Sequence, residues 1–382
     1  MKILFYGCLF TFLYIYFGYP FFVWLIGAIK NQKVKKEDYL PRVSIIISAH
    51  NEEKNIEDTL KNKLSLNYPK EMLEILVISD CSSDQTDNLV KKFEEQGVKL
   101  LRQEPRLGKT AALNMAVPVA KCEIIIFSDA NSIYEPNAIK KLIRNFNDPA
   151  VGYVTGKMIY TNQDGTIVGD GCSTYMRYEN FLRKIETKIG SIVGVDGAID
   201  AIRKELYHPM NSDQLPDFVL PLKVVEQGYR VVYEPEAIVK EPTLKTSKDE
   251  YKMRVRVSLR ALWALIDMKP LLNFKKYTIF SWELLSHKWL RYLSFLFLIG
   301  IYISNLFLFL LSQNQFYKIF FIFQNLTYIL GILASILEKQ GKKVEWLYLP
   351  FFFALIHLSS AHALLKLILG QKQVIWEPRK GT

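Results

Sequence analysis

The sequence predicts an α/β domain with a largely parallel sheet, joined to membrane-spanning helices at both ends of the chain. Between about residues 41 and 245, short β-branched runs alternate with longer amphipathic patterns, which is typical of doubly wound α/β domains. Uncharged apolar runs precede and follow this block. Half of the 382 residues are apolar and 23% are charged, a mixture too polar for a membrane bundle alone and too apolar for a purely soluble protein.

The first predicted element is a membrane helix in residues 1–30. No charge interrupts the run from Ile3 to Ile29, and about 20 apolar residues suffice to cross a bilayer. A cleaved signal peptide is the alternative, but the run is too long, is rich in Phe and Tyr and lacks a small-residue cleavage site. The lysine-rich flank at residues 30–36 favours an outside N-terminus and a cytosolic block after it.

Three further apolar runs fill residues 291–371. They are 292–317, 319–337 and 347 to about 369, the last containing His357, His362 and Lys366. The basic turn at 338–343 is expected in the cytosol, and four crossings would leave the C-terminus outside. The tail at 372–382 is also basic, so the last run either crosses, re-enters or lies on the surface. We expect the two histidines to pack or hydrogen-bond within the helices and not to bind metal.

The net charge of +11 is compatible with an anionic membrane surface, a phosphorylated substrate or a nucleic acid. The basic residues gather at membrane flanks and after the α/β block, without a base-stacking platform, so no nucleic acid partner is expected. The cysteines, which are Cys8, Cys81, Cys122 and Cys172, form no CxxC pair, and we expect reduced thiols that face the cytosol.

Within the α/β block, continuous apolar runs predict buried parallel strands at 43–48, 75–79 and 124–127. Amphipathic patterns predict helices at 53–64, 85–95, 109–119 and 135–146. Ligands of such domains bind beyond the carboxyl ends of the strands. Catalytic or binding side chains are therefore expected directly after each strand.

Polar and acidic residues do follow each predicted strand. The segments are 49–52, 80–84 and 128–131, and each contains a carboxylate. Helix capping is the alternative role for Asn51, Asp80 and Asp84, because their oxygens accept orphan N–H groups. Their occurrence at successive strand ends, with the basic loop 106–109 between two of them, favours one shared site. Neither GxGxxG after the first strand nor a P-loop occurs.

These segments resemble the family 2 inverting glycosyltransferases, which are membrane-associated enzymes with a GT-A nucleotide-sugar-binding domain. The resemblance covers most of the chain and rests on the order and spacing of six segments. They are SIIISAHNEE at 44–53, SDCSSDQT at 79–86, RLGK at 106–109, SDANS at 128–132, GVDGAIDAIRKELY at 194–207 and PDFVL at 216–220.

The resemblance implies roles for individual residues. Those implied to bind the nucleotide sugar are Ala49, Asn51, Glu52, Asp80 at the uracil, Lys109 near the base or diphosphate, and Asp129. Asp129 and Asn131 occupy the DxD positions, which implies that they hold Mg²⁺ or Mn²⁺ on the diphosphate. Asp217 stands at the position of the general base, although Pro216 replaces the acid that usually precedes it. A sugar hydroxyl is a poor nucleophile and needs such a carboxylate to take its proton.

The segment after this block, at 246–290, is expected to form amphipathic interfacial helices. Arg256, Arg260 and Trp263 share one helix face, where polymerising relatives carry QxxRW, but the Gln and the adjacent Trp are missing. The resemblance implies that these three residues and Asp196 contact the diphosphate or the acceptor. The alternative is a helix whose arginines meet anionic lipid, a role that does not exclude the first.

These observations predict a multi-pass enzyme of the cytoplasmic membrane with a cytosolic catalytic domain at 41–245. The expected reaction moves a sugar from a nucleotide sugar, specifically a UDP-sugar, with inversion onto a polysaccharide or oligosaccharide. A lipid acceptor, either a polyprenyl phosphate or a ceramide-like alcohol, is the alternative. A non-catalytic binding module is disfavoured because Lys109, Asp129 and Asp217 are all present.

Overall fold

An eight-stranded mixed sheet forms the centre of the α/β block in this computed structural model, which describes residues 1–161, 167–242, 246–340, 342 and 344–375, without the side chains of 167–173 and 345. The strand order is β3-β2-β1-β4-β7-β6-β8-β5. The strands are β1 Val43–Ala49, β2 Leu73–Asp80, β3 Val98–Gln103, β4 Ile124–Asp129, β5 Ile133–Tyr134, β6 Val151–Thr161, β7 Ile199–Arg203 and β8 Arg230–Pro242.

The three predicted strands are the parallel centre of this sheet. Ile45 of β1 pairs with Ile75 of β2 on one side and with Ile126 of β4 on the other. β7 runs antiparallel to both β4 and β6, and β5 runs antiparallel to β8, so the second half of the sheet is mixed. The parallel pairing brings the carboxyl ends of β1, β2 and β4 to one edge, as expected.

Helices cover both faces of the sheet, as the alternating pattern predicts. Side chains of β1 alternate between two cores, with Ile45 in one and Ile46 in the other. The first core includes residues of α3 Ile56–Leu64, α4 Thr86–Lys91 and α6 Ala138–Ile143, and the second includes residues of α5 Lys109–Val119 and α8 Pro216–Glu226. α6 begins later than predicted because Pro136 and Asn137 precede its first turn.

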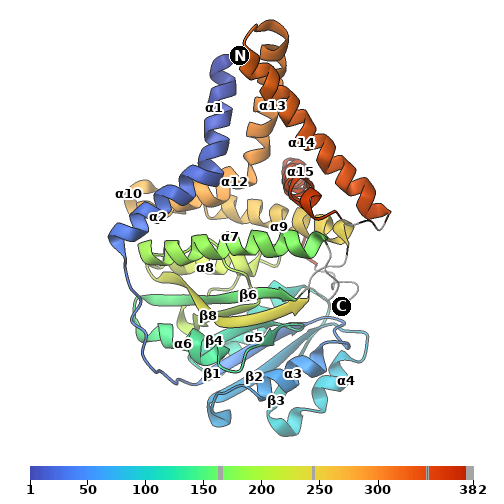
Figure 1. Ribbon diagram of the computed structural model, residues 1–382. Coiled ribbons are helices and arrows are strands. Elements are labelled where there is room, and N and C mark those ends of the chain that lie inside the picture. Colours follow the sequence, from blue (N-terminus) through green and yellow to red (C-terminus); the bar gives the residue numbers. More distant parts are fainter. Residues whose placement is uncertain (162–166, 243–245, 341, 343, 376–382) are drawn as a thin grey trace.

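A layer of helices separates the sheet from the apolar helices (Figure 1). It contains α7 Ile167–Ile189, α9 Ser247–Asp267, α10 Phe274–Tyr277, α11 Ile279–Glu283, the π-helical segment η7 Leu284–Trp289 and α12 Leu290–Tyr292. The segment predicted to lie at the membrane surface, 246–290, is therefore helical and stands between the catalytic sheet and the apolar helices.

Four helices in the described part of the chain are long and apolar enough to cross a membrane. The first is continuous from Lys2 to Lys30 and comprises α1 Lys2–Leu13, the π-helical η1 Tyr14–Gly18 and α2 Tyr19–Lys30; the others are α13 Ser294–Leu311, α14 Gln315–Lys339 and α15 Tyr348–Ile368. α13 ends earlier than the predicted run because a turn follows it, in which the side chain of Asn314 accepts the Phe316 N–H at 2.9 Å and caps α14.

The last apolar helix, α15, lies along α9. The Tyr251 hydroxyl and His362 Nδ1 are 3.0 Å apart, and Trp263 Nε1 donates to the Gln371 carbonyl at 2.9 Å. His357 Nε2 lies 3.1 Å from the Tyr16 hydroxyl. Both histidines of α15 are thus hydrogen-bonded among the helices, as expected.

Of the cysteines whose side chains are described, Cys8, Cys81 and Cys122 are free thiols, but Cys8 lies within the apolar helix α1 and so does not fit the prediction of a thiol that faces the cytosol. Cys172 lies among the residues whose side chains are not described.

Candidate active site

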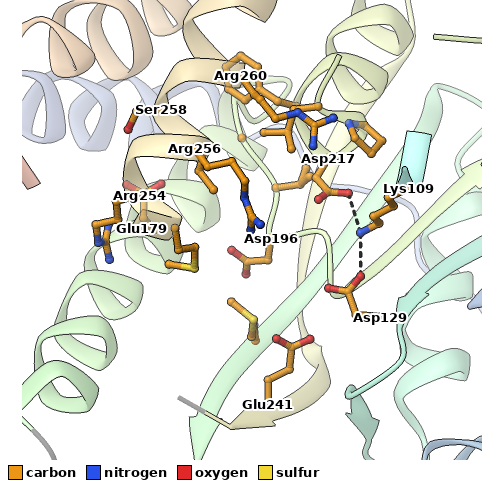
Figure 2. Close-up of a pocket in the computed structure, with 18 of the residues that line it drawn as sticks. Lys109, Asp129, Glu179, Asp196, Asp217, Glu241, Arg254, Arg256, Ser258 and Arg260 are labelled. Atoms are coloured by element: carbon orange, nitrogen blue, oxygen red, sulfur yellow. Dashed lines mark hydrogen bonds and ion pairs between the residues drawn. The ribbon is translucent and has the colours of Figure 1, made fainter. Parts of the chain in front are cut away.

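A cavity of about 340 Å³ opens at the carboxyl ends of β1 and β4, beneath α7, α9 and α15. Figure 2 shows part of its lining, including Lys109, Asp129 and Asp217. The predicted site residues found in its lining are Ala49, Glu52, Asp80, Lys109, Asp129, Asn131, Asp196, Asp217, Arg256 and Arg260. The structure does not bring Asn51 or Trp263 into this lining.

Lys109 lies at the centre of the site, between two carboxylates. Its Nζ is 2.8 Å from Asp129 Oδ1 and 3.4 Å from Asp217 Oδ1 (Figure 2). Burial disfavours the ammonium form, but the two carboxylates outweigh it and raise the pKa of Lys109 above its ordinary value. The side chain is therefore a fixed positive charge at physiological pH.

Asp217 lies in the first turn of α8, directly after Pro216 at the first helical position. Burial raises the pKa of Asp217 above that of an ordinary aspartate, and the Lys109 ammonium opposes this effect. Gly197, with φ of +81°, passes close to the carboxylate, because a Cβ there would lie 2.4 Å from Asp217 Cγ. Any side chain at position 197 would displace the Asp217 carboxylate, so this close approach requires glycine.

Asp80 supports the loop that delivers Lys109. Its Oδ1 accepts the Leu107 N–H at 3.0 Å, and its Oδ2 accepts the Gly108 N–H at 3.0 Å. Gly108 has φ of +89°, which glycine adopts readily, and α5 begins at the next residue. Asp80 therefore lines the cavity and also fixes the neighbouring loop.

Asn51 occupies the loop next to the cavity. It adopts φ of +53°, and its Oδ1 accepts the Ser83 N–H at 2.8 Å. Asp84 accepts the Thr86 N–H at 2.9 Å just before α4, although the N-cap position of that helix is Gln85 and not Asp84. The Glu52 N–H donates to Thr86 Oγ1 at 2.8 Å. These bonds hold the β1 and β2 ends together, with Asn51 as a link between them.

Asp129 and Asn131 supply the oxygens suited to a divalent cation. Among the described residues, no three His, Cys, Asp or Glu side chains gather at one point to hold a metal. One carboxylate and one amide oxygen fit Mg²⁺ or Mn²⁺ when phosphate oxygens and water complete the coordination. Asn131 does not cap α6, which begins at Ala138.

On α9, Arg256 and Arg260 reach the cavity while Trp263 does not. Arg260 is buried, donates to the Gln214 carbonyl and lies 3.3 Å from Thr110 Oγ1. Burial lowers the pKa of Arg260, and the nearby Asp217 carboxylate opposes that. Trp263 faces the C-terminal segment, with Lys372 Nζ 5.1 Å from its ring centre.

The sequence interpretation missed a second charged group in the cavity, contributed by α7, η7 and α12. Its lining members are Glu179, Arg183, His287, Lys288 and Arg291. The cluster of charged residues at 283–291, directly before an apolar run, was a signal that pointed to it. Arg183 pairs with Asp196 at 2.6 Å and so connects this group to a predicted residue.

Comparison with known proteins agrees with the fold and the motifs. The family model described as "Glycosyl transferase family 2" matches residues 44–207. The probable glycosyltransferase YdaM of Bacillus subtilis (strain 168) is 30% identical over 321 residues, which are 78% of this chain and 72% of that protein. The poly-beta-1,6-N-acetyl-D-glucosamine synthase of Staphylococcus aureus (strain COL) is 28% identical over 300 residues, 71% of each chain.

A solved structure shares the architecture along nearly the whole chain. The mannosyltransferase PcManGT from Pyrobaculum calidifontis, in complex with GDP-Man and Mn²⁺, superposes with a TM-score of 0.73 and 20% identity over 96% of this chain and 99% of that one. At this identity the likeness concerns the fold, which is the GT-A arrangement expected. With its motifs at the strand ends and a relative 30% identical over most of its length, the chain belongs to glycosyltransferase family 2.

Proposed function

We propose that this protein is a membrane glycosyltransferase that moves a sugar from a UDP-sugar, with inversion, onto a polysaccharide or oligosaccharide acceptor. The observation that carries the proposal is the single cavity in which Asp217 lies 3.4 Å from Lys109 and Lys109 lies 2.8 Å from Asp129. This cavity extends from the strand ends to α15, so the donor side and the membrane side share one space.

In the proposed reaction, Asp217 is the general base. It takes the proton of an acceptor hydroxyl while that oxygen attacks the anomeric carbon of the donor sugar. The bond from the anomeric carbon to the diphosphate oxygen breaks, and its electron pair leaves with the diphosphate. One displacement of this kind inverts the anomeric centre. The raised pKa of Asp217 favours proton transfer from a weakly acidic alcohol.

The donor is proposed to lie over the ends of β1, β2 and β4. Ala49, Glu52 and Asp80 would contact the nucleoside, with Asn51 fixing the loop beside them. Lys109 would donate to the diphosphate, where its positive charge offsets the charge that builds as the bond breaks.

We infer that the enzyme is metal-dependent, with Asp129 and Asn131 holding Mg²⁺ or Mn²⁺. The ion would supply positive charge to the leaving diphosphate. The PcManGT structure, which contains GDP-Man and Mn²⁺, supports a nucleotide sugar and a divalent ion in this fold.

A glycan acceptor is favoured by the similarity to a poly-beta-1,6-N-acetyl-D-glucosamine synthase. Transfer of one sugar to a polyprenyl phosphate or a ceramide-like alcohol is the second candidate, because Ile356, Ser359 and Ser360 of α15 also line the cavity. Arg256, Arg260 and Asp196 would contact the diphosphate or the acceptor. Trp263 lies outside the cavity lining, so it would influence the diphosphate or the acceptor only indirectly, through its hydrogen bond to Gln371.

The proposed location is the cytoplasmic membrane, crossed several times, with the catalytic domain at 41–245 in the cytosol. Residues 1–30 and 291–371 would form the membrane regions, 246–290 the interfacial helices and 372–382 a basic tail. The four apolar helices support this division.

The purified enzyme in nanodiscs, incubated with a panel of UDP- and GDP-sugars, tests the proposal. Oligosaccharide and polyprenyl phosphate acceptors are supplied in parallel, and products are sized by mass spectrometry. We expect transfer from one UDP-sugar to a glycan, with the opposite anomeric configuration in the product. Transfer from GDP-sugars alone would refute the UDP donor, and retention of configuration would refute the single displacement. Transfer only to polyprenyl phosphate would establish the second candidate.

A further inference from the structure

We propose that Lys288 and Asp196 bind the hydroxyl groups of the acceptor sugar in the arm of the cavity between η7 and the loop Gly194–Gly197. This inference rests on the proposed function and deepens it: it adds Lys288 to the site, and of the two roles proposed for Asp196, contact with the diphosphate or with the acceptor, it assigns the acceptor. Both residues line the cavity, and Lys288 comes from the π-helical segment η7.

The loop Gly194–Gly197 connects Lys288 to the proposed base. A Cβ at Gly194 would lie 2.5 Å from Lys288 Nζ, and one at Gly197 would lie 2.4 Å from Asp217 Cγ. Gly194 and Gly197 are three residues apart, and three residues of extended chain span at most about 11 Å. Lys288 and Asp217 therefore border one short stretch of backbone. Asp196 lies within this stretch, and one or two sugar units bridge such a length.

Lys288 lines the cavity and retains hydrogen-bonding capacity. It is 9% exposed, and its one ion pair among the described residues is to Glu179 Oε2 at 3.5 Å. Glu179 is also shared with Arg291 and with His287 Nε2 at 3.2 Å. An ammonium has three N–H donors, so a single long contact leaves donors for a ligand.

Asp196 offers the complementary acceptor. Its Oδ1 pairs with Arg183 at 2.6 Å, whereas its Oδ2 is buried and has no hydrogen-bond partner among the described residues. A buried carboxylate oxygen without a partner is costly unless a ligand donates to it. Arg183 Nε in turn donates to the Gly194 carbonyl at 3.0 Å, which fixes the loop.

This pairing of donor and acceptor selects a hydroxyl-rich ligand over a phosphate. One hydroxyl can donate to Asp196 Oδ2 while a neighbouring hydroxyl accepts from Lys288. A fully ionised phosphate has no hydrogen to donate, so it would leave the buried Asp196 Oδ2 without a partner. The arm therefore suits the end of a neutral glycan and disfavours the phosphate of a lipid acceptor.

The decisive variant is Lys288→Met, which keeps the length of the stem and removes the donors. Glu179 keeps His287 and Arg291 as partners, so the ionic cluster stays paired. We expect the KM for a short oligosaccharide of the transferred sugar to rise about 10- to 100-fold, the effect of losing a charged hydrogen bond. The KM for the nucleotide sugar and its hydrolysis by water should not change. Lys252→Met, at an exposed position of α9, is the matched control.

A second variant displaces Lys288 without altering its charge. Gly194→Ala places a methyl group against the ammonium, so the oligosaccharide KM should again rise, while Gly190→Ala, where no atom lies within 4 Å of the new methyl, should leave it unchanged. Two outcomes in an active Lys288→Met enzyme would overturn the inference. One is an unchanged KM for the oligosaccharide. The other is a loss of transfer to undecaprenyl phosphate alone. A wild-type protein that neither binds nor hydrolyses a nucleotide sugar would refute the proposed function itself.

Discussion

At the scale of single residues, the decisive feature is a carboxylate that remains basic although an ammonium lies beside it. Burial raises the pKa of Asp217 while Lys109, 3.4 Å away, favours its ionised form. The net effect is a pKa above that of an ordinary aspartate, so the ionised carboxylate is a stronger base than an exposed one. Activity should therefore be lost as the pH falls through that raised pKa.

Asp217→Asn tests the base directly. The amide keeps the shape but cannot accept the proton, so transfer should fall about 100-fold or more. The dissociation constant of the nucleotide sugar, measured by calorimetry, should stay close to the wild-type value. Asp58→Asn, on the exposed surface of α3, is the control. An equal loss of nucleotide affinity would show that Asp217 holds the donor or the fold instead.

Asp200 gives a separate, pH-dependent prediction. It is 1% exposed on β7, accepts the Tyr153 hydroxyl at 2.9 Å, and burial raises its pKa to about 7 from 3.8. The folded state then binds this proton more tightly than the unfolded state, so the free energy of unfolding falls as the pH rises from about 4 to about 7, by at most about 1.4 kcal/mol per pH unit. Asp200→Asn should remove this loss of stability, because the amide does not titrate.

Thermal unfolding of the wild type and Asp200→Asn between pH 4 and pH 8 measures this effect. The variant should gain stability relative to the wild type as the pH rises. Parallel curves for the two proteins would mean that Asp200 is ionised in the folded state throughout.

The metal proposal depends on Asp129 and Asn131. An amide coordinates a hard cation but adds no charge, so the free ion should bind weakly and enter with the sugar nucleotide. We expect Asp129→Ala to abolish transfer, Asn131→Ala to raise the Mn²⁺ concentration needed for half activity, and Asn131→Asp to lower it. Full wild-type activity in excess EDTA would contradict the assignment.

At the scale of elements, α9 joins the active site to the apolar helices. Its arginines face the cavity, while Tyr251 and Trp263 contact α15 and the segment after it. Arg260 also holds the loop before Asp217 through the Gln214 carbonyl. α9 therefore links the apolar helices to the loop before Asp217.

Arg256→Ala and Arg260→Ala separate catalysis from lipid binding. Each removes a charged contact worth about 1.5 to 3 kcal/mol, so kcat/KM for the nucleotide sugar should fall about 10- to 100-fold. Flotation with anionic liposomes measures lipid affinity in the same variants. Full turnover with weakened liposome binding would establish the purely interfacial role.

At the scale of the whole molecule, the ends of the apolar helices fall into two groups, one far from the sheet and one on the side of the sheet. Met1 and the turn between α13 and α14 lie at the same end (Figure 1), and Phe5 packs on Tyr317 with ring centres 5.5 Å apart. Lys30 and Lys339 end their helices on the side of the sheet. This arrangement suits an outside N-terminus and a cytosolic sheet domain.

Single cysteines at Lys33 and Lys339, in a background free of cysteine, test the topology. Both should resist an impermeant thiol reagent in intact cells and react after the membrane is permeabilised. A cysteine at Gln313, in the turn between α13 and α14, should react in intact cells and serves as the positive control. Labelling of Lys33→Cys and Lys339→Cys in intact cells would refute this orientation.

The sequence alone predicted the three parallel strands of the sheet centre and the acidic segments that follow them. Runs such as residues 43–48 are apolar on both faces, which requires burial within a sheet, and parallel strands bring their carboxyl ends to one edge. Roles for Asp129 and Asp217 could be predicted because the motifs that carry the family resemblance are local in sequence. Prolines mark two helix starts, since α8 begins at Pro216 and α6 begins only after Pro136.

Only the tertiary structure decided which side chains meet across the cavity. Helical spacing placed Trp263 with Arg256 and Arg260, yet Trp263 turns to Gln371, because the chain that packs there lies over a hundred residues away in sequence. The pairing of Lys288 with Glu179 has the same origin. Periodicity reports which face of a helix is buried but not its partner, and that partner is fixed only when distant elements pack together.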